Sequence, residues 1–222
     1  MKTALIIGAS RGIGREFAHQ LLASGWTVYA TARSKADLKS LDQLKAKPIQ
    51  LDVSNPSSIA ATAWNLDGVQ IDLAIYVAGI YGPNSGAKEV PSSAEFDDVM
   101  HVNVLGAMQL IPLIAPIIEE SGGKFIFVSS LMGSIASTQS SFGWIYRTSK
   151  AALNMAIKSA CNDYPKAIFA AMNPGWVQTQ MGGSNAPTTP KESVSKMLGV
   201  IEKLTLKDTG AFKSYDNREM SW

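Results

Sequence analysis

Tyr146 and Lys150 are the residues of this chain whose types and spacing favour chemistry most directly. Residues four positions apart on a helix share one face, with roughly 5–6 Å between their Cβ atoms. A cation beside a phenol favours the phenolate, so it lowers the pKa of a tyrosine that otherwise titrates near ~10. A tyrosine brought toward the working pH can pass a proton to or from a substrate oxygen. The pair therefore indicates proton transfer, with the hydroxyls of Ser129 and Ser130 upstream as hydrogen-bonding groups.

The first turn of the chain has the spacing of a nucleotide-binding loop. Residues 8–14 read G-A-S-R-G-I-G, which places Gly8, Gly12 and Gly14 between a predicted strand and a predicted helix. Glycines permit a tight turn and let backbone N–H groups approach a pyrophosphate at the positive end of the following helix. A plain packing turn is the alternative for such a string. The strand–turn–helix context favours nucleotide binding, and a nicotinamide beside a proton donor would give carbonyl reduction or alcohol oxidation.

The end of the second predicted strand bears on the choice of nicotinamide cofactor. Chains that bind NAD usually carry an Asp or Glu there, about 20 residues past the glycines, on the ribose hydroxyls. This chain has Y-A-T-A-R-S with Arg33, and Arg11 lies inside the glycine turn. Two guanidinium groups suit a 2′-phosphate, so the sequence favours NADP(H) over NAD(H), unless both arginines only face solvent. Asp52 in L-D-V fits either a hydrogen bond from the adenine amino group or the start of a turn.

Short apolar runs alternate with helical stretches along most of the chain. The predicted strands are residues 4–7, 28–31, 49–51, 73–77, 124–129, 167–172 and 211–215. The predicted helices are residues 13–23, 35–44, 57–64, 95–119, 145–163 and 191–203. This order predicts one α/β domain over residues 1–222, a Rossmann-type doubly wound parallel sheet of about seven strands flanked by helices. Loops 80–93, 131–143 and 182–190 follow strands and either frame a substrate pocket or form plain surface connections.

Composition and charge limit the classes of partner. The chain has 222 residues, 46% of them hydrophobic and 17% charged, with a formal net charge of +2, which argues against nucleic acid or an anionic membrane as the main partner. Cys161 is the one cysteine, so an intrachain disulfide is excluded and a reducing compartment fits. The apolar run 4–7 is too short for a signal peptide, so we expect a cytoplasmic protein. His19 and His101 lack metal-ligand spacing, and no metal site is predicted.

The order of the motifs resembles the short-chain dehydrogenase/reductase family over nearly the whole chain. They are the glycine turn, L-D-V, Ala78-Gly79, H-V-N-V-L-G, V-S-S-x-x-G, Y-x-x-x-K and N-P-G-W-V-x-T. Each motif alone is weak evidence for the family, whereas the occurrence of all of them in this order is specific. The tail that begins G-A-F-K-S-Y-D-N is similar to the C-factor-like branch, to which the carbonyl reductases are close relatives.

The resemblance implies a catalytic set of Asn103, Ser130, Tyr146 and Lys150. In the family, the serine hydroxyl bonds the substrate oxygen and the tyrosine donates a proton in reduction or accepts one in oxidation. The lysine holds the nicotinamide ribose and favours the phenolate, and the asparagine supports a water that links the lysine to solvent. The implied cofactor-binding residues are Gly8, Ser10, Arg11, Gly12, Ile13, Gly14, Arg33, Asp52, Val53, Ala78, Gly79, Tyr146, Lys150, Pro174, Gly175, Val177 and Thr179.

Three departures from the family pattern affect these expectations. Tyr76-Val77 stands where the family has Asn-Asn, so the asparagine side-chain contacts are lost. The stretch from Ser130 to Tyr146 is slightly longer than usual. Few residues separate Thr179 from the next predicted helix, which leaves little room for a helical lid and predicts an open pocket. Met132, Phe142, Trp144, Trp176 and Met181 would contact an apolar substrate there or belong to the core or an interface.

The expected function is therefore NADP(H)-dependent reduction of a small-molecule carbonyl. The alternatives are a catalytically weak NADP(H)-binding regulator and a C-factor-like signalling protein, although regulators commonly lose the Tyr/Lys pair that this chain keeps. Apolar stretches 105–118 and 151–156 need covering, and the corresponding helices form dimer interfaces in the family. We expect a homodimer, with a tetramer as the alternative. Pro112 and Pro116 are expected to kink the first of these helices or end it early.

Overall fold

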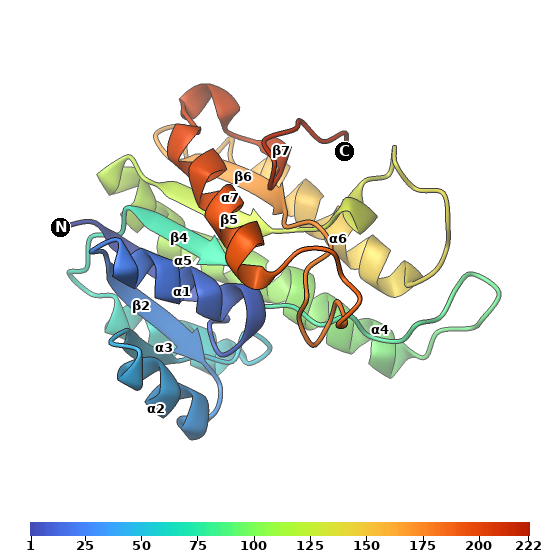
Figure 1. The fold of residues 1–222 in the computed structure, drawn as a ribbon, viewed down its shortest axis with the longest axis horizontal. Coiled ribbons are helices and arrows are strands. Elements are labelled where there is room, and N and C mark those ends of the chain that lie inside the picture. The colour runs from blue at the N-terminus through green and yellow to red at the C-terminus, as the bar shows by residue number, and fades with distance from the viewer.

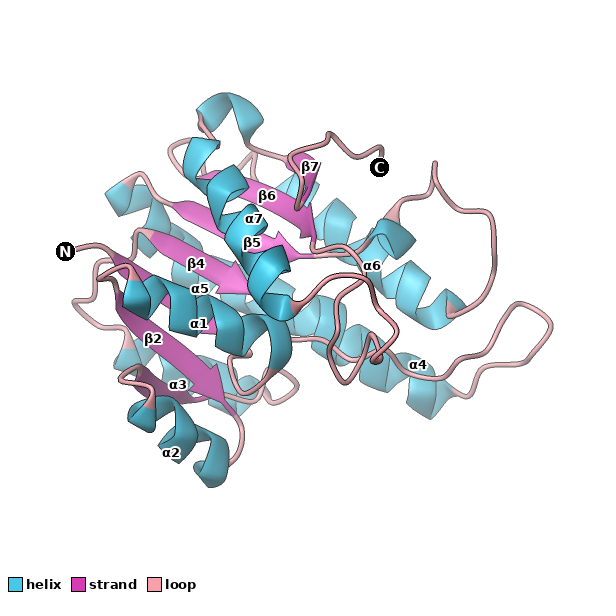
Figure 2. Ribbon diagram, viewed as in Figure 1, coloured by secondary structure: helices cyan, strands magenta, loops and turns pink.

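The fold, taken from a computed structural model that describes residues 1–222, is built on one parallel seven-stranded sheet (Figures 1 and 2). The strand order is β3-β2-β1-β4-β5-β6-β7, and every neighbouring pair is parallel. The strands are β1 Thr3–Ile7, β2 Thr27–Ala32, β3 Lys47–Gln50, β4 Leu73–Tyr76, β5 Lys124–Val128, β6 Ile168–Asn173 and β7 Ala211–Ser214. The doubly wound single-sheet architecture predicted from the sequence is confirmed.

Helices cover both faces of this sheet. They are α1 Gly12–Ala23, α2 Lys35–Gln43, α3 Pro56–Asn65, α4 Ser93–Met100, α5 Gly106–Ser121, α6 Trp144–Ala160 and α7 Pro190–Lys203. Side chains from α1, α2 and α7 belong to one apolar core, and side chains from α3, α5 and α6 belong to the other. The first layer lies in front of the sheet in Figure 1 and the second lies behind it.

The apolar runs of the sequence explain why the strands are covered on both sides. Successive side chains of a strand point to opposite faces, so a strand between two helical layers must be apolar at every position. In β5, Phe125 and Phe127 join the core under α5 and α6, while Ile126 and Val128 join the core under α1 and α7. The two phenylalanine rings stack with centroids 4.3 Å apart. Burial on both faces therefore fixes the sheet that carries the site.

The segment predicted as one helix over residues 95–119 contains an irregular turn. Helix α4 leads into a π-helical turn, His101–Leu105, which leads into α5. Pro112 and Pro116 do not end the helix early, because α5 continues to Ser121. The combined run, Ser93–Ser121, is the one helix long and apolar enough to cross a membrane, but half of its most apolar window is buried in the protein, as in an ordinary core helix. Single π-turns of this kind often lie at functional sites.

Candidate active site

Six strand ends place most of the predicted site residues along one edge of the sheet. After β1 come Gly8, Ser10, Arg11, Gly12, Ile13 and Gly14; after β2 comes Arg33; after β3 come Asp52 and Val53; after β4 come Ala78 and Gly79; and after β6 come Pro174, Gly175, Val177 and Thr179. Ser130 follows β5 at the same edge. Open parallel sheets bind ligands at the carboxyl ends of their strands, so the fold brings the predicted residues to the place where a ligand site is expected.

Tyr146 and Lys150 share one face of α6, as their spacing predicts. The Nζ atom of Lys150 lies 5.7 Å from the centroid of the Tyr146 ring, and both side chains are buried. The lysine also donates a hydrogen bond to the backbone carbonyl of Val128, at 2.9 Å. Ser130 caps the short turn that follows β5, where its Oγ accepts the N–H of Met132 at 3.1 Å. The phenol, the amine and the hydroxyl therefore form one cluster.

Burial, and not the neighbouring charge, governs the protonation of this cluster. It raises the pKa of Tyr146; a hydrogen bond with the Ser130 hydroxyl opposes the rise and Tyr81 adds to it. Burial lowers the pKa of Lys150 to about 8. The prediction that the pKa of Tyr146 lies below its ordinary value is therefore wrong, because burial outweighs the groups that favour the phenolate. Removing both charged forms from water costs more than their attraction returns at this separation.

Asn103 connects the loop after β4 to the catalytic helix. It is fully buried in the π-helical turn, and its Nδ2 donates to the carbonyl of Ile80 and to Ser149 Oγ, each at 2.9 Å. Its Oδ1 accepts the N–H of Ile80 at 2.8 Å. Ser149 in turn donates to the carbonyl of Tyr146 at 2.8 Å. The amide therefore fixes the position of α6 against the strand-end loop, while the water relay stays a prediction.

The glycine turn has a shape that larger residues could not adopt. A Cβ on Gly8, whose φ is +91°, would lie 2.8 Å from the backbone nitrogen of Ala78, and a Cβ on Gly14 would overlap the carbonyl oxygen of Gly8. Helix α1 then begins at Gly12 with no side chain capping its first N–H groups and no acid in its first turn. Free N–H groups at a helix N-terminus attract anions, so this turn fits the pyrophosphate of a dinucleotide.

Thr179 brings the last predicted cofactor segment against the same turn. Its Cγ2 atom lies 3.2 Å from the position that a Cβ would take on Gly12. Its Oγ1 accepts the N–H of Gly182 at 3.0 Å, which closes a tight turn after β6. No helix forms between Thr179 and α7, which agrees with the prediction that this short segment leaves little room for a helical lid.

The residues predicted to bind the ribose phosphate and the adenine lie after β1, β2 and β3. Arg11 and Arg33 are exposed and form no ion pair within the chain. Asp52 starts a turn, because its Oδ1 accepts the N–H of Ser54 at 3.0 Å and the Ser54 hydroxyl at 2.7 Å. Burial opposes ionisation of Asp52, but those two bonds and the charge of Arg33 leave its pKa below the ordinary value. The turn predicted as one role of Asp52 is therefore present.

Two side chains outside the predicted site residues, Asn173 and Tyr76, hold this site together. Asn173, buried at the end of β6, accepts the N–H of Leu131 at 3.1 Å and the N–H of Gly175 at 3.2 Å through its Oδ1. It thereby joins the serine loop to the turn after β6, and its place in N-P-G was the available signal. Tyr76, at the position of a family asparagine, is fully buried and donates to the carbonyl of Val102 at 2.6 Å. That bond ties β4 to the π-helical turn.

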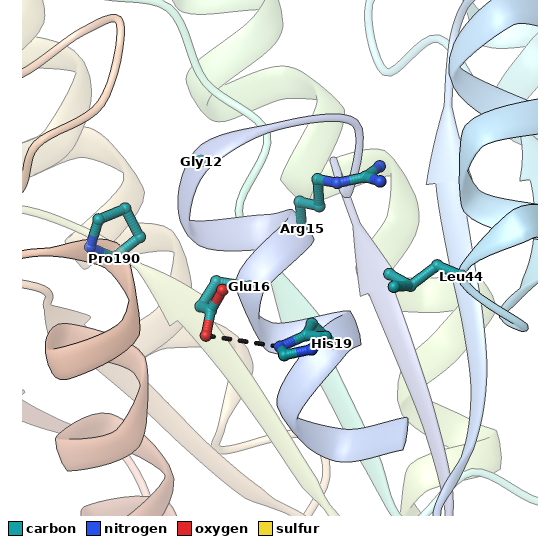
Figure 3. Close-up of a pocket in the computed structure, with 6 residues that line it drawn as sticks. All are labelled: Gly12, Arg15, Glu16, His19, Leu44 and Pro190. Carbon is teal, nitrogen blue, oxygen red and sulfur yellow. Dashed lines mark ion pairs between the residues drawn. The ribbon is translucent and has the colours of Figure 1, made fainter. Parts of the chain in front are cut away.

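Two surface cavities lie outside the catalytic cluster. The first, about 370 Å³, lies over the outer face of α1 and is lined by Gly12, Arg15, Glu16, His19, Leu44 and Pro190 (Figure 3). Within it, His19 Nδ1 lies 3.8 Å from Glu16 Oε1. The second, about 490 Å³, lies between α3 and α5. The first cavity meets the glycine turn through Gly12, and neither one is lined by Tyr146 or Lys150.

The fold and the strand-end site define a nucleotide-binding oxidoreductase of the short-chain type, and comparison with known proteins agrees. The family model described as short chain dehydrogenase matches residues 2–190. This chain therefore belongs to the short chain dehydrogenase family.

The proteins that this chain resembles include the C-signal and solved structures of carbonyl reductases. The C-signal of Myxococcus xanthus is 33% identical over 165 residues, which cover 73% of this chain and 99% of that protein. The carbonyl reductase Sniffer of D. melanogaster is 28% identical with a TM-score of 0.93, over 100% of both chains. The NADPH-bound carbonyl reductase from chicken fatty liver is 30% identical with a TM-score of 0.89, over 100% of this chain and 99% of that one. The predicted resemblance to the C-factor-like and carbonyl reductase branch is confirmed.

Proposed function

We propose that this protein reduces an aldehyde or a ketone to the alcohol with NADPH, and that Tyr146 donates the proton. The observation that carries the proposal is the cluster of the buried Tyr146 and Lys150 with the partly buried Ser130, at the sheet edge that also holds the glycine turn. A similar carbonyl reductase binds NADPH, which supports the same cofactor here. When bound, the reduced nicotinamide supplies a hydride to the carbonyl carbon.

Each residue of the cluster then has a separate role in the reaction. The hydroxyl of Ser130 donates a hydrogen bond to the carbonyl oxygen and so fixes its position. Tyr146 holds its proton until the oxygen gains negative charge, because burial raises the pKa of the phenol. The proton moves to that oxygen as the alcohol forms, which is general acid catalysis. A buried ammonium at Lys150 stabilises the phenolate that remains, since opposite charges interact more strongly away from water.

Cofactor choice follows from the charges at the ends of β1 and β2. Arg11 and Arg33 are free of ion pairs within the chain, and no acid follows β2 to bind the ribose hydroxyls. Guanidinium groups form charge-assisted bonds with phosphate oxygens, so both arginines would hold the 2′-phosphate of NADPH. The uncapped start of α1 would hold the pyrophosphate.

The test is product analysis with labelled cofactor. The purified protein is incubated with NADPH dideuterated at C4 of the nicotinamide and a panel of aldehydes and diketones. The expected result is NADPH consumption together with alcohol that carries one deuterium on the carbinol carbon. A protein that binds NADPH but forms no labelled alcohol from any member of the panel would overturn the proposal.

A signalling or regulatory role is the second candidate, and one observation favours it. C-signal matches 73% of this chain at 33% identity. The complete cluster of Ser130, Tyr146 and Lys150 gives a regulator no evident advantage, so we place reduction first. If the protein binds NADPH, turns over no carbonyl and behaves like Tyr146→Phe in every assay, the regulatory role is the better account.

A further inference from the structure

Tyr81 lies against the proposed proton donor but has no part in the mechanism above. Its ring stacks on the ring of Tyr146, with centroids 4.7 Å apart and planes 26° apart. Aromatic pairs at this separation attract one another beyond the apolar area that they bury. Tyr81 is only partly buried, whereas Tyr146 is almost fully buried, so Tyr81 keeps some contact with solvent beside the buried phenol.

The loop that carries Tyr81 is fastened to the first residues of the catalytic helix. The carbonyl of Ser85 accepts the N–H of Gly143 at 2.9 Å and the N–H of Trp144 at 3.4 Å. Gly143 has φ +66°, and a Cβ there would overlap the Tyr81 hydroxyl and lie 3.0 Å from the Cζ atom of Tyr81. The Tyr81 ring is therefore held between Gly143 and Tyr146. Its position depends on the same helix that carries the proton donor.

The surroundings of Tyr81 are apolar on the side of the serine loop. The Cε atom of Met132 lies 3.1 Å from the same Cβ position on Gly143, so the thioether and the Tyr81 phenol meet at this point. Leu131 and Phe142, in the loop after Ser130, are each about half exposed, at 50% and 53%. A substrate whose oxygen reaches Ser130 and Tyr146 must place its substituent beside these side chains. Burying their apolar surface favours an apolar substituent over a polar one.

We propose that Tyr81 is a positioning residue for the reduction, which holds the Tyr146 phenol in place and forms the wall that selects carbonyls with a flat aromatic substituent. This inference rests on the proposed function and adds a substrate class to it. A flat ring can lie against the Tyr81–Tyr146 pair, and a short alkyl chain offers less area for the same contact. Contacts of this kind change affinity by roughly two- to tenfold.

The experiment compares wild type with Tyr81→Leu and Tyr81→Phe, using NADPH with benzaldehyde and with butanal. Tyr29→Leu, on β2 beside Lys47, is the matched control for loss of a tyrosine. For Tyr81→Leu we expect kcat/KM to fall about tenfold or more with benzaldehyde and about threefold or less with butanal. Tyr81→Phe, which keeps the ring, should restore wild-type behaviour within about twofold.

Two results would overturn the inference, and they differ from failure of the proposed function. If Tyr81→Leu keeps the wild-type ratio of kcat/KM for benzaldehyde and butanal, the ring does not select aromatic substituents and the inference is wrong. If Tyr81→Phe loses as much kcat/KM with benzaldehyde as Tyr81→Leu does, the hydroxyl of Tyr81 and not the stacking of its ring is responsible for the effect. If the wild type itself reduces neither aldehyde while binding NADPH, the proposed function has failed and this inference fails with it. Thermal unfolding of each variant identifies any loss caused by misfolding.

Discussion

Tyr146 and Lys150 are both nearly inaccessible to water, and this burial decides the protonation state of each side chain. The exposed fraction is 7% for the tyrosine and 3% for the lysine, so neither charged form is well solvated. Burial holds the phenol in its protonated form and lowers the pKa of the amine to about 8. Reduction requires a protonated phenol as the proton donor. Burial disfavours the phenolate, so it keeps Tyr146 in the form that reduction needs.

Lys150 should give the cofactor-free protein a measurable dependence of stability on pH. Its folded pKa of about 8 lies below the ordinary 10.5, so between these values the unfolded chain binds more protons and stability rises with pH. Relative to Lys150→Met, the free energy of unfolding of the wild type should increase by roughly 2 kcal/mol from pH 8 to pH 10. Urea unfolding at a series of pH values measures the difference, and parallel curves for the two proteins would contradict the expected shift.

Arg33 should contribute to cofactor preference through its charge. Loss of a charge-assisted bond to a phosphate costs roughly 1.5–3 kcal/mol, so Arg33→Ala should lower kcat/KM with NADPH about tenfold or more. The same variant should change kcat/KM with NADH by about twofold or less, because NADH lacks the 2′-phosphate. Lys39→Ala, which removes an exposed positive charge from α2, is the control. Equal losses with both cofactors, or a wild type that prefers NADH, would count against the assignment.

At the residue scale, the sequence predicted that Tyr146 and Lys150 lie together on one helix, but it did not predict their electrostatics. Spacing alone placed Tyr146 and Lys150 on one face of a helix, and the motif V-S-S-x-x-G located Ser130. The pKa of Tyr146 depends on how completely the folded chain excludes water from the phenol, and a local sequence pattern does not predict that burial. The contact of Tyr81 with Tyr146 was equally hidden, because it joins a loop without periodicity to a helix 65 positions away.

Elements position the site by ending together at one edge of the sheet. The glycine turn after β1 is the tightest of these ends, since Gly8, Gly14 and Ala78 pack backbone against backbone. The π-helical turn between α4 and α5 inserts Asn103 into the same region, where its amide bonds the loop after β4. Apolar periodicity predicted the strands and helices to within a few residues. It could not predict the π-helical turn, which keeps the helical hydrophobic pattern on both sides.

Gly14 should tolerate no side chain. A Cβ there meets the carbonyl oxygen of Gly8, so Gly14→Ala must distort the turn that receives the pyrophosphate. We expect the Kd for NADPH to rise about tenfold or more and stability to fall by about 1–3 kcal/mol. Gly199→Ala in α7 is the control, because a Cβ there meets no atom within 4 Å; it should be neutral or stabilising by up to ~1 kcal/mol. Fluorescence titration and thermal unfolding measure both effects, and unchanged NADPH binding by Gly14→Ala would refute this role of the turn.

The whole molecule leaves part of its apolar surface uncovered on the layer that carries α5 and α6. Met155 on α6 is 66% exposed, Met108 on α5 is 51% exposed and Leu105 is 38% exposed. Isolated apolar residues are common on surfaces, but three of them on α6, on α5 and on the π-helical turn that precedes α5 favour a second copy as their cover. The homodimer predicted from the sequence therefore stays our expectation for the assembly.

Light scattering coupled to size exclusion tests this assembly. The wild type should have about twice the mass of the 23.7 kDa chain, and Met155→Glu should shift it toward the monomer, since a carboxylate buried without a partner is costly. Trp64→Glu, at a position 86% exposed on α3, should leave the mass unchanged. A monomeric wild type, or an equal shift with Trp64→Glu, would count against an interface at α5 and α6.

The central claim, that the Tyr146 phenol supplies the proton, is tested most directly by a steady-state comparison of wild type with Tyr146→Phe. The variant keeps the ring that stacks on Tyr81 and loses only the hydroxyl. We predict that kcat for NADPH-dependent carbonyl reduction falls by about 10²–10⁴-fold, while the Kd for NADPH stays within about threefold of wild type. A Tyr146→Phe protein that reduces the same carbonyl at the wild-type rate would contradict the claim.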